Sequence, residues 1–329
     1  MTKHKINIPK LTICILLSFV LVCIIIKPSV YMQATLKGVI VWANSVMPAL
    51  FPFFFLTTIL LELNALNSFA KIFKRPLKLF FNVSDNAAFV YLMSIISGYP
   101  IGAKLIYELY KTNRINTNEA IRINAFTSTS GPAFILGTIG SSMLLNPSFG
   151  VIILISHYLS SFINGFIYRN YGLKDKSNTL AIVSTNKDMS NMLANSIKQS
   201  VISVLIVGGY IALSFMFCAF LTDTKIINVI IIPINFILSL LHLPTTFTTS
   251  IVLGLTEITR GCLELSSFIT LYPKTVIVLI SGIVAFGGVS VALQSMTYLK
   301  KCKVPLKIYL LQKLTQAILA IIISSIIAI

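Results

Sequence analysis

The stretch ISGYPIGAKLIYEL (residues 96–109) places a cation directly after a group of helix-breaking residues at the end of an apolar run. Gly98, Pro100 and Gly102 interrupt the run, and Lys104 follows them. A lysine at mid-membrane depth costs about 2.5–3.5 kcal/mol on insertion scales. Its side chain therefore either reaches an aqueous interface along its alkyl stem or serves a function in a polar cavity.

A second stretch, GLTEITRGC (residues 254–262), has the same character. Lys104 follows Gly98 at the same distance in sequence at which Arg260 follows Gly254. The two stretches therefore share both a helix breaker and a cation in the same register.

The composition predicts a polytopic membrane protein. Of 329 residues, 56% are hydrophobic and 11% are charged, and the mean hydropathy is +0.89. A soluble domain carries about 25% charged residues. The net charge of +17 arises from basic residues between apolar segments, for example in 71–78 and 300–307. This distribution is typical of cytoplasmic loops, so we expect contact with anionic lipid and no nucleic-acid partner.

The sequence carries no recognisable catalytic or metal-binding pattern. The cysteines form no CxxC or Cys/His ligand spacing, and HExxH, GxSxG and P-loop motifs are absent. We therefore expect no enzyme activity, no metal and no resident cofactor. His157, in LISHYLSS, is either a polar residue bonded within a helix bundle or a functional one.

Long apolar segments predict an all-α chain of about eight to ten membrane-embedded helices. About 20 apolar residues span a bilayer. The basic N-terminus followed by the apolar run 11–26 predicts an uncleaved first transmembrane helix with a cytoplasmic N-terminus. The further apolar segments are 38–63, 86–107, 123–145, 149–168, 199–222, 226–243, 247–272, 275–296 and 306–328.

Several of these segments contain helix breakers. The motifs are MPALFPFFF, SGYPIGAK, NAFTSTSGPAF and SGIVAFGGVS. One such break is often a simple kink, because neighbouring protein can satisfy the freed backbone groups. Breaks in several segments instead favour the re-entrant or unwound helices of transporters.

The polar stretch 169–198 divides the chain into two halves. It is rich in Lys, Asn and Ser, and its basic residues place it in the cytoplasm. We therefore predict a first membrane repeat over 1–168, a polar cytoplasmic linker over 169–198, and a second membrane repeat over 199–329.

The glycine spacing supports two structural repeats. The interval from Gly98 to Gly131 equals the interval from Gly254 to Gly287. Matched interrupted segments in two halves are the best sequence indication of a transport site. The repeat is more easily inverted if segment 86–107 crosses the membrane, but a re-entrant hairpin is favoured there. The predicted helix-break residues are Gly98, Pro100, Gly102, Gly131, Pro132, Gly254, Gly287 and Gly288.

The two cations predict an anion site. Arginine offers a planar fork for a carboxylate and lysine a point charge, so Lys104 and Arg260 from related half-sites would suit a dianion. The alternative is that both side chains snorkel to an interface. Glu257 either pairs with Arg260 on the next turn, or binds a coupling Na⁺ or a proton.

A polar run before a Gly-Pro break predicts the rest of the site. Its hydroxyl groups can bond to helix carbonyls, but their number favours an unwound stretch that lines a substrate or ion site. The predicted substrate-binding residues besides the two cations are Tyr99, Asn124, Thr127, Ser128, Thr129 and Ser130, with Ser290, Gln294 and Ser295 of second rank.

The motifs MPALFPFFFLT, SGYPIGAKL, FTSTSGPAFILGTIG, ISHYLS and GLTEITRGC resemble the YlbJ family of sporulation integral membrane proteins. The resemblance covers about residues 37–296. The chain is similar more distantly to the gate domain of concentrative nucleoside transporters, which carry a G-x-T-E motif. Gly254, Thr256 and Glu257 match that motif, which lies in a substrate-binding hairpin of those transporters. Glu257 and Thr256 are the predicted ion-coupling residues. The first half has GYPI at the corresponding place.

The resemblance implies a role in the mother cell during endospore formation, in cortex formation and in loading dipicolinic acid. We therefore expect a secondary transporter of a small organic anion in the mother-cell or outer forespore membrane. The alternatives are a nucleoside-type carrier and a non-transporting scaffold for the spore envelope. A second copy of the chain or other sporulation membrane proteins are the expected protein partners.

Overall fold

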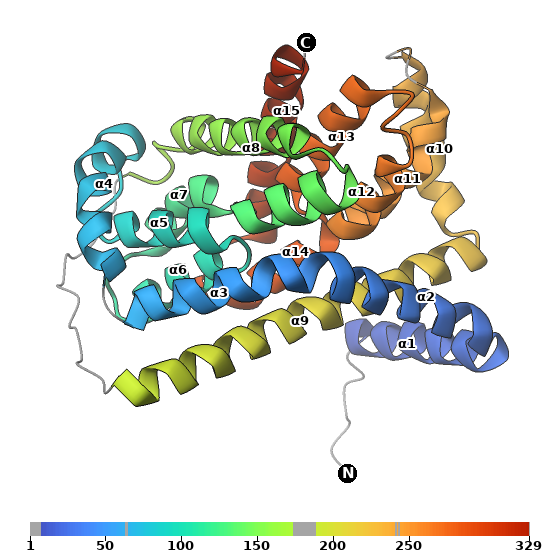
Figure 1. Ribbon diagram of the computed structural model, residues 1–329, viewed down its shortest axis with the longest axis horizontal. Helices are drawn as coiled ribbons and strands as arrows, with labels where there is room; N and C mark the ends of the chain where they lie inside the picture. Colours follow the sequence, from blue (N-terminus) through green and yellow to red (C-terminus); the bar gives the residue numbers. More distant parts are fainter. Residues whose placement is uncertain (1–7, 63–64, 174–188, 241, 243, 329) are drawn as a thin grey trace.

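The structure is a computed structural model that describes residues 8–62, 65–173, 189–240, 242 and 244–328. Within these ranges every regular element is a helix, as the sequence predicts (Figure 1). The helices are α1 (Ile8–Ile26), α2 (Pro28–Val41), η1 (Trp42–Val46), α3 (Met47–Glu62), α4 (Ala65–Phe81), α5 (Ala87–Ser97), α6 (Ile101–Lys111), α7 (Thr117–Thr127), η2 (Ala133–Met143), α8 (Pro147–Ile167), α9 (Met189–Asp223), α10 (Ile227–Leu240), η3 (Thr245–Phe247), α11 (Thr248–Thr256), α12 (Ile258–Ser266), α13 (Pro273–Phe286), α14 (Gly288–Leu299), η4 (Lys300–Cys302) and α15 (Leu306–Ile327).

Five helical stretches in the described residues are long and apolar enough to cross a membrane, and shorter apolar helices accompany them. Many large apolar side chains are exposed, such as Val229 (72%) and Ile232 (69%). Both observations agree with a multi-pass membrane protein. The five stretches are Pro28–Leu60, Pro147–Ile167, Met192–Asp223, Pro273–Cys302 and Leu306–Ile327.

Two long helical rods form one edge of the molecule. α2, η1 and α3 lie along α9 (Figure 1). A close approach holds them together: Trp42 packs over Gly208, and its Nε1 donates a hydrogen bond to the carbonyl of Val204 at 3.1 Å. Residues 189–198, which the sequence assigns to the linker, form the first turns of α9, whereas residues 174–188 lie outside the described ranges.

Four apolar segments that the sequence defines as single units are each divided into two helices. The divisions fall between α5 and α6, α7 and η2, α11 and α12, and α13 and α14. The predicted breaks at SGYPIGAK, TSTSGP and VAFGGVS therefore occur. α5 and α6 pack on each other in the predicted hairpin. In MPALFPFFF the prediction of a break is wrong, because α3 continues through Pro52 and a π-helical turn (Trp42–Val46) precedes it.

Two predicted helix-break residues lie inside helices instead. Gly102 belongs to the first turn of α6, where a Cβ would lie 2.6 Å from Oγ of Ser94. Gly254 belongs to α11, and a Cβ on the facing Gly261 would lie 2.2 Å from its Cα. Both glycines therefore allow close packing within a hairpin, and the third break falls at Glu257, which separates α11 from α12.

Two pairs of corresponding helix boundaries in the two halves share one interval, and the other pairs differ from it by a few residues. The distance in sequence from the start of α7 at Thr117 to the start of α13 at Pro273 equals the distance from the end of η2 at Met143 to the end of α14 at Leu299. The hairpin α5/α6 likewise precedes α7 as the hairpin α11/α12 precedes α13.

The turns that are rich in Lys and Arg lie together at one end of the molecule. The hydroxyl of Thr117 donates to the carbonyl of Cys302 at 3.0 Å, and a guanidinium nitrogen of Arg122 donates to the carbonyl of Tyr171 at 2.7 Å. These bonds join α7, which follows the turn after α6, to the turns that follow α14 and α8, and α4 packs on the same apolar cluster. The basic residues of these turns and of α4 are Lys71, Lys74, Arg75, Lys78, Lys111, Arg114, Arg169, Lys300, Lys301 and Lys303.

Candidate functional site

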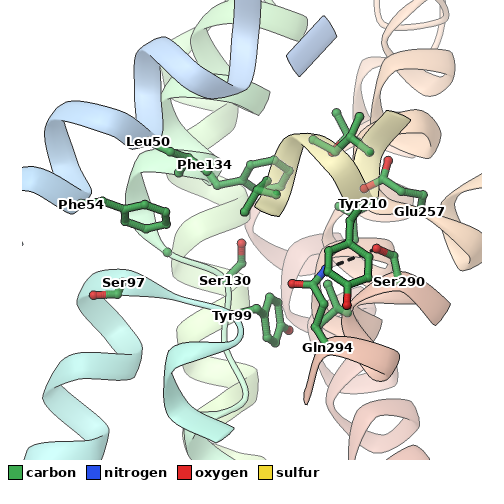
Figure 2. A pocket seen from close by; sticks show the side chains of 16 residues that line it. Leu50, Phe54, Ser97, Tyr99, Ser130, Phe134, Tyr210, Glu257, Ser290 and Gln294 are labelled. Carbon is green, nitrogen blue, oxygen red and sulfur yellow. Dashed lines mark hydrogen bonds between the residues drawn. The ribbon is translucent and has the colours of Figure 1, made fainter. Parts of the chain in front are cut away.

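A cavity lies where the four broken segments meet. It encloses about 590 Å³, counting the part that opens to the exterior. Each break contributes residues to the wall, and α3 and α9 close the remaining sides (Figure 2). The lining residues are Leu50, Phe54, Ser97, Tyr99, Ser130, Gly131, Phe134, Val207, Tyr210, Ile211, Glu257, Ile258, Thr259, Ser290, Val291 and Gln294.

The breaks touch each other in pairs. A Cβ added to Gly98 would overlap the backbone nitrogen of Gly131, so the first and second breaks are in backbone contact. A Cβ added to Gly288 would lie 3.0 Å from the carbonyl oxygen of Gly254, so the fourth break contacts the segment before the third. Gly98 and Gly288 both have positive φ (+70° and +68°), which explains why glycine is needed at these contacts.

The predicted polar run divides between the cavity and the surrounding helices. Ser130 lines the cavity, and its backbone N–H donates to Nε2 of the buried His157 at 2.8 Å. Asn124 instead donates to Gln312 at 2.7 Å. The hydroxyls of Thr127 and Thr129 donate to carbonyls of Ile123 and Ser94. Asn124 and the two threonines do not line the cavity, and their bonds are those of helix packing.

The residues of second rank divide in the same way. Ser290 and Gln294 of α14 line the cavity and bond to each other at 3.4 Å. Ser295 is 1% exposed and does not line it. The face of α14 that carries Ser290 and Gln294 is therefore the one that meets the cavity.

The two predicted cations do not come together. Lys104 is exposed and lines neither the cavity between the breaks nor the one beside Arg260. Arg260 pairs with Glu264, with 2.7 Å between Nη2 and Oε1, and its guanidinium lies 4.8 Å from the centre of the Phe215 ring. The prediction that these two residues share one dianion is therefore wrong, because α6 turns Lys104 outward.

Arg260 lines a second cavity, on the other side of α12. This cavity lies between α2, α9 and α11 and reaches Asp223 at the end of α9. Asp223 is itself bonded there, to Nζ of Lys27 at 2.6 Å and to the hydroxyl of Tyr31 at 3.0 Å. The first turn of α12 therefore separates two cavities, with Glu257 on one and Arg260 on the other.

Glu257 is held in the wall of the first cavity. It is 5% exposed, and its Oε2 accepts a hydrogen bond from the backbone N–H of Arg260 at 2.7 Å. The carboxylate thereby caps the N-terminus of α12. Thr256 does not line the cavity, and its hydroxyl donates to the carbonyl of Val252 at 3.1 Å. The carboxylate of Glu257 is thus the acidic group that the cavity presents to a cation or a proton.

Sequence reasoning missed Lys313, which α15 buries to 1% exposure. Its Nζ donates to the hydroxyl of Tyr99 at 2.7 Å, to the carbonyl of Ser128 at 2.8 Å and to Oε1 of Gln316 at 2.8 Å. Ser128 therefore meets the lysine and does not line the cavity. The signal in the sequence is YLLQKLTQ (309–316), where a cation and two amides interrupt an apolar segment. Lys313 lies directly behind the cavity wall that Tyr99 forms.

No group of three or more His, Cys, Asp or Glu side chains in the described residues has the arrangement of a metal site. The polar groups of the cavity are instead hydroxyls, one amide and one carboxylate. Such groups suit an organic molecule with a few polar atoms, and the carboxylate of Glu257 suits a cation.

Comparison with known proteins identifies a clear relative. The chain is 28% identical over 337 aligned residues to Sporulation integral membrane protein YlbJ of Bacillus subtilis (strain 168), covering 95% of this chain and 82% of the relative. No family model matches the chain. No solved structure matches it either. The resemblance in the sequence motifs is confirmed: the chain is a homologue of Sporulation integral membrane protein YlbJ, an integral multi-pass membrane protein.

Proposed function

We propose that the protein is a secondary transporter of a small organic anion, with dipicolinate as the favoured substrate, and that the cavity between the four breaks is its binding site. The observation that carries the proposal is the convergence of these breaks on one cavity. Unwound backbone inside a membrane protein is tolerated only where protein or water satisfies it, and transporters use such helices to bind substrates near the bilayer centre.

We further propose that the two halves are inverted repeats. The shared interval between corresponding helix ends supports this relation. The same order of elements holds for the long rods, since α2 to α3 precede the first hairpin as α9 precedes the second. Both hairpins approach the same cavity, as expected if a two-fold axis in the membrane plane relates them.

The basic end of the molecule faces the cytoplasm in this proposal. Short loops on the cytoplasmic side carry an excess of Lys and Arg. The turns after α6, α8 and α14 carry that excess, whereas the opposite end has isolated cations such as Lys27 and Lys274. We place the protein in the mother-cell or outer forespore membrane, in keeping with its sporulation relative.

Transport is coupled to a cation in this proposal. Two like charges about 4 Å apart repel by about 4 kcal/mol at an effective dielectric constant of about 20. An anion and the ionised Glu257 would therefore exclude each other from one cavity. A proton or Na⁺ on Glu257 removes this repulsion, so that the anion and the coupling cation enter together.

Dipicolinate fits the chemistry of the walls. It is a planar aromatic dicarboxylate, and the cavity is lined by apolar side chains together with hydroxyl groups and one amide. A nucleoside-type carrier is the second candidate. It is favoured by Gln294 and Ser290, which are neutral partners suited to a base or a ribose.

Uptake of labelled dipicolinate into proteoliposomes tests the proposal. The purified chain is reconstituted and given an imposed Na⁺ or proton gradient. The variant Val207→Trp fills the cavity from α9, and Val201→Trp is its matched control, because Val201 lies on the same helix away from the cavity and is 38% exposed.

We expect uptake by the wild type, at least tenfold less with Val207→Trp, and wild-type uptake with Val201→Trp. Uptake of nucleosides instead of dipicolinate would favour the second candidate. Absence of uptake of either compound under both gradients would contradict the proposal and favour a scaffold.

A further inference from the structure

Lys313 connects three of the four broken segments. Its ammonium donates to the hydroxyl of Tyr99 in the first break and to the carbonyl of Ser128 in the second. Its Cε lies 3.6 Å from the position that a Cβ on Gly287, in the fourth break, would occupy. The side chain therefore occupies the junction of unwound backbone from both halves of the chain.

The charge of Lys313 is not balanced by an acidic partner. The ammonium is buried, and its three acceptors are a phenol, a carbonyl and an amide. Within the described part of the chain no carboxylate forms an ion pair with it. Removing an ion from water still costs several kcal/mol after relaxation. A cation retained at such a position in a membrane protein is by default a candidate for function.

Hydrogen-bonding capacity remains around this ammonium. Nε2 of Gln316, whose Oε1 accepts from Lys313, is buried and has no partner among the described residues. The hydroxyl of Ser128, whose carbonyl accepts from Lys313, is also buried without a hydrogen bond of normal geometry, as is the hydroxyl of Tyr309 on the same helix as Lys313. An unpartnered buried polar group costs about 1–3 kcal/mol.

We propose that Lys313, acting through Tyr99, is the cation that selects anionic substrates in the cavity. Tyr99 both lines the cavity and accepts a hydrogen bond from Lys313. Its phenolic proton is therefore free to point away from the ammonium, and in the structure it faces the carbonyl of Val284 at 3.4 Å. A carboxylate in the cavity is a better acceptor than this carbonyl, and the adjacent positive charge strengthens the bond.

The inference rests on the proposed transport function and assigns separate walls to the anion and the cation. The anion binds at the Tyr99 wall, and the coupling cation binds at Glu257. Figure 2 shows these two side chains apart, with Tyr99 near Ser130 and Glu257 beyond Tyr210. Lys104, exposed on α6, has no part in selection.

A comparison of two ligands that differ by one carboxylate tests the inference. The two ligands are dipicolinate (pyridine-2,6-dicarboxylate) and pyridine-2-carboxylate. Their uptake and equilibrium binding are measured for the wild type, Lys313→Met, Tyr99→Phe and the control Lys104→Met. Lys313→Met keeps an unbranched side chain of nearly the same length and removes its charge. We expect Lys313→Met to raise KM and Kd for the dicarboxylate at least tenfold, and those for the monocarboxylate less. Lys104→Met should match the wild type.

A purely structural role for Lys313 would lower the amount of folded protein and weaken the binding of both ligands in the same proportion. That result, or wild-type binding by Lys313→Met, would overturn the inference while leaving the transport function intact. If Lys313→Met does not fold, Tyr99→Phe decides, because it keeps the ring and removes the hydroxyl. Unchanged selectivity in Tyr99→Phe overturns the inference. Failure of the wild type to bind either ligand overturns the transport function, and the inference with it.

Discussion

Single residues determine where the helices break. Gly98 has φ +70° and ψ −161°, a conformation that is essentially restricted to glycine, and it lies against the backbone of Gly131. Either constraint alone would exclude a side chain. Gly209, by comparison, has no atom within 4 Å of the position of a Cβ.

We expect Gly98→Ala to destabilise the protein by at least about 1–3 kcal/mol, the cost of a non-glycine residue in this conformation. The overlap with Gly131 adds to that cost. Thermal unfolding in detergent, with Gly209→Ala as the control, measures the difference. Equal unfolding temperatures for the two variants would mean that the first break does not have this backbone.

Prediction from the sequence succeeds at the residue scale where a residue type alone carries the signal. Glycine and proline indicate the breaks at Gly98, Gly131 and Gly287, because few other residues have their backbone preferences. Prediction fails where the role of a residue depends on which face of its helix the side chain occupies. α6 buries Ala103 and Ile106 and turns Lys104 outward, a direction that the spacing from the break does not reveal.

Lys313 escapes sequence reasoning for the complementary reason. It lies in a long apolar helix that contains neither glycine nor proline. Its importance comes from Tyr99 and Ser128, which are distant in sequence and which the folded chain brings to it. Only the tertiary structure identifies these partners.

At the scale of elements, the short helix α12 depends on its cap. Glu257 accepts the N–H of Arg260, and the same carboxylate faces the cavity. Glu257 thus both stabilises α12 and, in the proposed function, binds the coupling cation. Two substitutions distinguish these roles. Glutamine retains the acceptor oxygen without the charge, whereas alanine removes both.

We expect Glu257→Ala to lose about 1 kcal/mol of stability, as is usual for a lost N-cap, and Glu257→Gln to lose less. Both variants should lose the dependence of uptake on the Na⁺ or proton gradient. Thermal unfolding and gradient-dependent uptake are the two measurements. Gradient-driven uptake by Glu257→Gln at the wild-type rate would show that the coupling cation binds elsewhere.

The element order is largely predictable because hydropathy and breakers define it. Hairpin α5/α6 and the division of 275–296 follow directly from SGYP and FGG. Two features of the element order cannot be predicted from the sequence. The sequence ends the linker at residue 198, whereas α9 begins at Met189, since the polar start of this helix has no breaker. The prolines of α3, in turn, remain within a helix.

At the scale of the whole molecule, the proposed topology sets the ends of one span on opposite sides of the membrane. The stretch Pro273–Cys302 contains α13, the break and α14. Lys274 near its start and Lys301 near its end are both exposed. In the proposed orientation Lys301 lies in the cytoplasm and Lys274 on the opposite side.

We expect a membrane-impermeant thiol reagent to label Lys274→Cys in intact cells and Lys301→Cys only after the cells are opened. The native cysteines, of which Cys14 is exposed, are first replaced by serine. Labelling of the two positions in the reverse order would invert the orientation. Labelling of both positions in intact cells would mean that this stretch does not cross.

The membrane class is accessible from the sequence, because composition is a property of the chain as a whole. The cavity is not, since its walls come from four breaks and two long helices. The sequence assigns the anion to the two most conspicuous cations, Lys104 and Arg260, whereas in the folded chain these share no cavity and a third cation, Lys313, is buried.

The interval that relates α7 to α13 also relates His157 on α8 to Lys313 on α15, and these two helices pack together. Two identical halves would make the inward-open and outward-open conformations of a carrier equal in free energy. Here an imidazole accepts from Ser130 in one half, and an ammonium donates to Ser128 from the other. Exchanging the roles of the halves therefore changes the free energy, so one of the two conformations of the proposed carrier is the more populated at rest.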